Sequence, residues 1–162
     1  MLPTCDHVYA SDYKWYKHHI ADLTRDYEGQ LWTQSEAWTE KNQDIDPGQW
    51  GIKCLTAKTQ AKGLSRDKDV IHTLSNSGAA AIGLAYRLGA TRIILLGFDM
   101  MLSGGKRHWF GNHPDQLHVG SNYQQFMATI ATIKPEEYGI EIWNCSRRTA
   151  LKCFPIYNLD DL

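Results

Sequence analysis

The residues best suited to acid–base chemistry are three histidines in one glycine-rich segment, residues 103–120. His108 and His113 flank a Gly-Asn step, and we expect both to face one pocket together with Asp99. A neutral imidazole is a suitable general base near pH 7, for example for the hydroxyl group of a sugar. His118 is a second-choice base in the same segment. The predicted catalytic residues are therefore His108, His113 and His118.

The same histidines and Asp99 also fit two other roles. Histidine and aspartate are acceptable ligands for a divalent cation, but the spacing here selects no coordination geometry. They fit equally well as residues that order the loop through hydrogen bonds. We predict no metal site and no resident cofactor, while catalysis, ligand contact and loop ordering stay open as roles for these side chains.

A short polar turn opens the strongest helical pattern of the sequence, which covers residues 76–90. Ser77 can cap this helix, and Gly89 fits a left-handed stop. The main-chain N–H groups at the start of such a helix present the positive end of the helix dipole to a phosphate. Capped turns of this kind are also common wherever a helix meets a sheet, so phosphate binding and simple capping both remain open.

A continuous apolar run, residues 92–98, follows that helix. Such a run is typical of a parallel strand that is buried on both faces. Asp99 comes directly after it, at the edge where open α/β sheets bind their ligands. Asp12 has the equivalent place after a shorter strand at residues 7–10, and it can also cap the helix that follows.

The predicted elements alternate between strand and helix. Strands are expected at residues 7–10, 30–33, 50–55, 92–98 and 139–143, and helices at residues 12–23, 35–41, 76–90 and from 123 up to Pro135. Residues 56–73 and 144–162 have no period and are predicted to be a long loop and an irregular tail. This order predicts an α/β fold, a Rossmann-like three-layer sandwich with a mostly parallel sheet, as a single domain over residues 1–162.

The composition excludes several classes of protein. The chain has 162 residues, of which 43% are hydrophobic and 22% charged, and its formal net charge is -1. It therefore has no net field that would hold nucleic acid or an anionic membrane. No apolar run approaches the roughly 20 residues of a membrane span, and the first residues do not resemble a signal peptide. We expect a globular cytoplasmic protein without a membrane partner.

The cysteines indicate no metal or redox site. Their spacing contains no CxxC pair, and a domain of this size does not need disulfides. We expect all four to be buried, inert thiols: Cys5, Cys54, Cys145 and Cys153.

Several segments together resemble a known family. Asn76-Ser77-Gly78, the helix after it and the run from Ile93 to Met100 resemble the core of a phage and bacterial family of unassigned α/β proteins. That family is similar to the bacterial α-2,3-sialyltransferases and to a 6-hydroxymethylpterin pyrophosphokinase-like group. The further matching pieces are residues 9–16, 31–34, 63–66, 104–114, 144–146 and 149–151.

The resemblance implies a nucleotide or nucleotide-sugar ligand. In the sialyltransferases, the segment that matches Asn76-Ser77-Gly78 contacts the cytidine monophosphate part of the donor, and the segment that matches Gly97-Phe98-Asp99 lies beside it. With Asp12 at the same predicted edge, the nucleotide-binding residues are expected to be Asp12, Asn76, Ser77, Gly78, Gly97, Phe98 and Asp99. The implied protein is a phage-encoded, glycosyltransferase-like enzyme of the host cytoplasm. The alternative is a non-catalytic protein that binds a nucleotide or a host protein.

The chain departs from the family pattern in two places. Family members carry a glycine-rich loop after a first strand, and that strand is not in this sequence. In the resembling folds it lies in the middle of the sheet, so we expect its flanking strands to pair directly or to be hidden in a homo-oligomer, most simply a two-fold dimer. The histidine that serves as general base in the sialyltransferases aligns with Ser121, three residues from His118.

Overall fold

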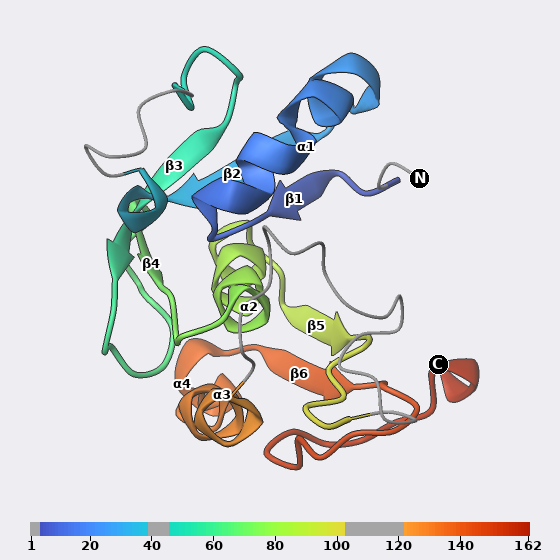
Figure 1. Cartoon of the computed structure of the whole chain (residues 1–162). Helices are drawn as coiled ribbons and strands as arrows, with labels where there is room; N and C mark the ends of the chain where they lie inside the picture. The colour runs from blue at the N-terminus through green and yellow to red at the C-terminus, as the bar shows by residue number, and fades with distance from the viewer. Residues whose placement is uncertain (1–3, 39–45, 103–121) are drawn as a thin grey trace.

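The computed structural model describes residues 4–38, 46–102 and 122–162 (Figure 1). Within these ranges, parallel strands alternate with helices, which confirms the α/β fold. The strands are β1 (His7–Tyr9), β2 (Gln30–Gln34), β3 (Lys53–Lys58), β4 (Val70–His72), β5 (Arg92–Leu95) and β6 (Glu141–Asn144). The helices are α1 (Tyr13–Asp26), α2 (Ser77–Arg87), α3 (Tyr123–Ile130) and α4 (Pro135–Tyr138), with short 3-10 helices at Ser35–Ala37 and Leu159–Asp161.

The parallel strands form two sheets. One contains β1, β2, β3 and β4 in that order, and the other contains β5 and β6. Val8 lies opposite Leu31 in the first sheet, and Ile93 lies opposite Ile142 in the second. Within the described residues, β1 pairs only with β2 and β5 pairs only with β6, so direct pairing of β1 with β5 is not observed.

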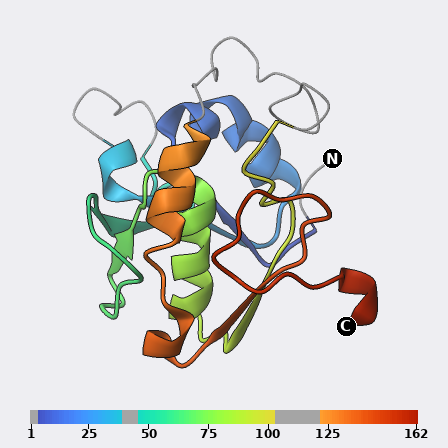
Figure 2. The same cartoon turned by 90° about the horizontal axis from the view of Figure 1, so that it is seen from below.

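Helix α2 lies between the two sheets (Figures 1 and 2). Ala80 and Leu84 pack with side chains of the four-stranded sheet, whereas Ala79 and Ile82 pack with side chains of β5 and β6. A helix with apolar contacts on both sides needs small residues so that both sheets can approach closely. This explains the run of glycine and alanine in α2.

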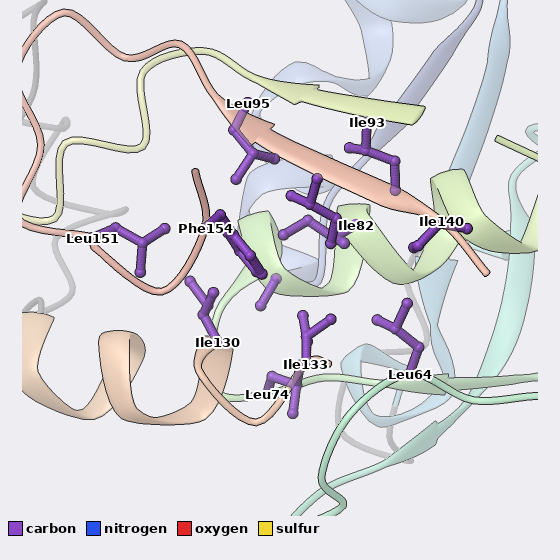
Figure 3. Close-up of a cluster of buried hydrophobic side chains, with 12 residues drawn as sticks. Leu64, Leu74, Ile82, Ile93, Leu95, Ile130, Ile133, Ile140, Leu151 and Phe154 are labelled. Atoms are coloured by element: carbon purple, nitrogen blue, oxygen red, sulfur yellow. The ribbon is translucent and has the colours of Figure 1, made fainter. Parts of the chain in front are cut away.

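The larger core lies between α2, the β5–β6 sheet and the segment after α3 (Figure 3). Ile93 and Leu95 point from β5 toward Ile82, and Ile130 and Ile133 close the core from the other side. A smaller cluster packs α1 on the first sheet; its buried members are Ala10, Tyr16, Ile20, Leu23, Leu31 and Ile52.

Several predictions about elements are wrong. The strand expected at residues 50–55 begins only at Lys53, after a turn at residues 47–51, and the helix expected from residue 35 is a 3-10 helix that ends at Ala37. The long loop expected at residues 56–73 contains the end of β3 and the whole of β4, whose three residues are too few to show a period. The strand expected at residues 92–98 ends at Leu95. It is also not buried on both faces, since 42% of Ile94 is exposed and 58% of Leu96. Because β5 has a core on one side only, its alternate side chains face solvent.

Two further details differ from the sequence prediction. Asn76, not Ser77, is the N-cap of α2, and its side-chain oxygen accepts a hydrogen bond from the Ala79 N–H. Only Cys145 is buried, whereas Cys5, Cys54 and Cys153 are exposed. The predicted cap of α1 at Asp12 and the left-handed residue at Gly89 are confirmed. No helix in the described ranges is long and apolar enough to span a membrane.

Candidate functional site

Some of the predicted nucleotide-binding residues, among them Ser77, Gly78 and Phe98, lie where the segments after β1 and β5 meet the start of α2. The hydroxyl oxygens of Ser11 and Ser77 are hydrogen-bonded at 2.6 Å, which joins the end of β1 to the first residue of α2. The Phe98 ring lies against Gly78: a Cβ atom added at Gly78 would be only 3.1 Å from two carbons of the ring. The ends of two strands that belong to different sheets therefore meet at one helix start.

Two of the predicted ligand contacts are used in capping. Asn76 accepts from the Ala79 N–H at 2.7 Å, and its amide group donates to the Leu74 carbonyl. An oxygen of Asp12 accepts from the Lys14 N–H at 2.9 Å. These bonds satisfy main-chain donors that the helix cannot satisfy itself. In this structure, both side chains thus fix the helix starts that border the site.

A cavity of about 760 Å³ lies at the carboxyl ends of β5 and β6, and two of the predicted nucleotide-binding residues, Gly97 and Asp99, are among its described lining residues. Its size is in the range of small-molecule sites, and its position is the one that ligands occupy in open α/β sheets. Gly97 and Asp99 form the part of its wall that follows β5. The remaining walls are the segment after β6, with Arg147 and Arg148, and the C-terminal segment, residues 156–160.

A buried hydrogen-bond network fixes the walls of this cavity. Asn144, which is completely buried, accepts from the Ser146 N–H and donates to Thr149 Oγ1 and the Leu151 carbonyl. Ser146 Oγ accepts from the Phe98 N–H at 2.8 Å, and Thr149 Oγ1 donates to the Phe98 carbonyl at 2.7 Å. The segments that follow β5 and β6 are therefore held together on both sides of Phe98.

Sequence reasoning missed three residues at these sheet edges. Arg147 and Arg148 follow β6 by three and four residues and belong to the segment predicted to be an irregular tail; no local signal in the sequence indicates them. Gln34 ends β2 and is buried; it donates to the Ser11 carbonyl at 3.1 Å. Its side-chain oxygen has no partner within the described residues, so it is a further polar group at the carboxyl edge.

The predicted catalytic histidines, His108, His113 and His118, lie outside the described residues. In the part of the chain that is described, no group of three or more His, Cys, Asp or Glu side chains could hold a metal ion. Cys145 lines the cavity. Partial burial raises the pKa of the Cys54 and Cys153 thiols, which makes both poorer nucleophiles near neutral pH.

Comparisons of the chain with protein-family models, with curated proteins and with solved structures find no match. The function must therefore be inferred from the site itself.

Proposed function

We propose that this protein binds a nucleotide or nucleotide sugar at the carboxyl ends of β5 and β6 and acts as a glycosyltransferase-like enzyme. The observation that carries the proposal is the cavity of about 760 Å³ at the carboxyl ends of β5 and β6, with Gly97 and Asp99 in its wall. This is the arrangement expected of a ligand site in an α/β fold. The resemblance stated from the sequence supports the identity of the ligand as a nucleotide.

The proposed reaction is transfer of the sugar to an acceptor hydroxyl. The acceptor oxygen attacks the anomeric carbon of the sugar, and the bond from that carbon to the phosphate oxygen breaks. The nucleotide leaves with the electron pair of that bond, and a histidine base takes the proton of the acceptor hydroxyl. His108, His113 and His118 are the candidates for this base, and Asp99 is placed to accept a hydrogen bond from a ligand hydroxyl.

A thermal-shift titration tests ligand binding. Nucleoside mono- and diphosphates and their sugar derivatives are expected to raise the Tm progressively with concentration, because a ligand of the native state stabilises it. Asp99→Asn is expected to weaken the shift. Asp69→Asn, on the exposed turn before β4, is the matched control and is expected to leave it unchanged. Absence of a shift with every nucleotide and nucleotide sugar would contradict the proposal.

Release of free nucleotide from a nucleotide sugar separates transfer from binding. The wild-type protein is expected to release it in the presence of a suitable acceptor. Replacement of both His108 and His113 by alanine is expected to abolish release but to preserve the thermal shift. Binding without release by the wild-type protein would favour the alternative, a non-catalytic nucleotide-binding protein.

A further inference from the structure

We infer that Arg147 and Arg148 hold the phosphate group of the ligand. This inference rests on the proposed function and names the part of the site that selects a nucleotide over a nucleoside. Both arginines line the cavity at the carboxyl end of β6. Guanidinium groups are well suited to this task because their fork of N–H donors matches phosphate oxygens.

These two side chains have no partner among the residues that the structure describes. Neither forms a hydrogen bond or an ion pair with the described residues. Every other arginine in the described ranges binds a carboxylate or a main-chain carbonyl: Arg25, Arg66, Arg87 and Arg92. The chain thus satisfies its arginines elsewhere and leaves only this pair, among those described, available to an anion.

The main chain that carries the two arginines is also held in place by hydrogen bonds. Ser146 and Thr149 flank the two arginines, and both bind the main chain of Phe98. The Ala150 N–H donates to the Asp99 carbonyl at 2.8 Å, which adds a third link to the same segment. A loop held at both ends loses little backbone entropy when a ligand binds, and so the arginines are preorganised.

The rest of the cavity fits the other parts of a nucleotide. The carboxylates of Asp99 and Asp160 line it together with the arginines and can accept from ribose or sugar hydroxyls. Tyr157, 43% exposed, lines the cavity and packs on Trp143 with the ring centroids 4.7 Å apart. Its ring offers an apolar surface to a base. Two cationic groups, two hydroxyl acceptors and an aromatic surface thus share one cavity.

Calorimetric titration of the full chain tests the inference. The four common nucleoside monophosphates, the corresponding nucleosides and inorganic phosphate are the probes. The wild-type protein is expected to bind its preferred monophosphate at least tenfold more tightly than the nucleoside. The double variant Arg147→Gln/Arg148→Gln is expected to lose at least tenfold in affinity for the monophosphate and nothing for the nucleoside. Added salt is expected to weaken the binding of the monophosphate but not that of the nucleoside.

Two variants serve as controls. Arg25→Gln removes a surface arginine of α1 that pairs with Asp22 and Asp26, and it is expected to leave affinity unchanged. Arg147→Lys/Arg148→Lys keeps the charge but loses the fork of donors, so an intermediate loss is expected. Because the two arginines have no partner to lose, the thermal unfolding of the double glutamine variant should match that of the wild-type protein.

The outcomes distinguish this inference from the proposed function. If the wild-type protein binds a nucleotide and the double glutamine variant binds it equally well, the arginine pair is excluded while the function stands. The same holds if nucleoside and monophosphate bind equally. If inorganic phosphate binds as tightly as every monophosphate and the double variant loses it, the pair is supported and the nucleotide function is overturned. If no probe binds the wild-type protein, both fail.

Discussion

The two sheets end differently at their carboxyl edges. At the end of β1 and β2, the side chains bind one another and the main chain. Thr33 is completely buried; it donates to the Ala10 carbonyl at 3.0 Å and accepts from the Trp38 indole at 3.2 Å. The Tyr16 hydroxyl donates to the Trp32 carbonyl at 2.6 Å, and burial raises the pKa of Tyr16, so it stays neutral. Most of the polar groups described at this edge are already satisfied.

The edge of β5 and β6 has an equally well bonded main chain but a different surface. Asn144 fills the role that Thr33 fills in the other sheet, since it too is buried and hydrogen-bonded. Beyond it, however, Arg147 and Arg148 face a cavity. A buried polar network thus fixes the carboxyl edge of each sheet. A binding site additionally needs charged side chains that are not already paired within the protein.

The outer sides of β1 and β5, which pair with no other strand of the described residues, predict association, the largest effect expected here. An edge strand with apolar side chains invites pairing with another chain. Light scattering at micromolar concentration is expected to give twice the monomer mass of 18.5 kDa. Ile94→Lys, on β5, is expected to return the protein to a monomer because a lysine on an edge strand opposes pairing.

Leu88→Lys is the matched control for this prediction. Leu88 and Ile94 are equally exposed, at 43% and 42%, but Leu88 lies at the end of α2. This variant is expected to keep the mass of the wild-type protein. A wild-type mass of 18.5 kDa would show that neither edge is covered by a second copy, and equal dissociation of both variants would remove β5 from the interface.

The buried polar residues of the two edges are expected to differ in their contribution to stability. Asn144→Leu removes three hydrogen bonds, to Ser146, Thr149 and Leu151. Thr149 keeps its bond to Phe98, but the Ser146 N–H and the Leu151 carbonyl lose this partner, and each unsatisfied buried group costs about 1–3 kcal/mol. The free energy of unfolding should therefore fall by roughly 3 kcal/mol or more. Thr33→Val strands two partners and is expected to cost about 2 kcal/mol.

Urea denaturation of the two variants measures this difference. The slope of the free energy of unfolding against urea concentration should be the same for both variants and the wild-type protein. The midpoints of the unfolding transitions then report differences in stability. If Asn144→Leu lowers the free energy of unfolding no more than Thr33→Val does, water replaces the missing side chain. The cavity wall is then less fixed than the hydrogen bonds indicate.

Much of the fold could be predicted because it depends on local pattern. The alternation of strands and helices, the cap at Asp12 and the left-handed Gly89 each depend on a few neighbouring residues. The division into two sheets could not be predicted, since it depends on which strands find partners across the chain. The exposure of Ile94 follows from that division, because the same apolar residue would be buried in the middle of one continuous sheet.

The positions of candidate residues could be predicted where an element boundary marks them. Asn76, Ser77 and Gly78 lie at the start of a helix and Asp99 follows β5, so their place near a sheet edge follows from the pattern, while their role as ligand contacts stays a prediction. Arg147 and Arg148 were missed because nothing local distinguishes a ligand-facing arginine from a solvated one. The difference is the absence of a partner in space, and only tertiary structure shows it.

The smallest expected effect compares two glycines on opposite sides of α2. A Cβ atom at Gly83 would lie 3.9 Å from Ile71 and Leu64, an ordinary van der Waals distance on the side of the four-stranded sheet. Gly83→Ala is therefore expected to raise the free energy of unfolding by up to about 1 kcal/mol, because alanine is the better helix former. At Gly78 the same atom would be 3.1 Å from the Phe98 ring, which must move. Gly78→Ala is expected to give no increase in the stability measured by thermal unfolding. An equal increase in stability for both variants would mean that Phe98 is not held in place by Ser146 and Thr149.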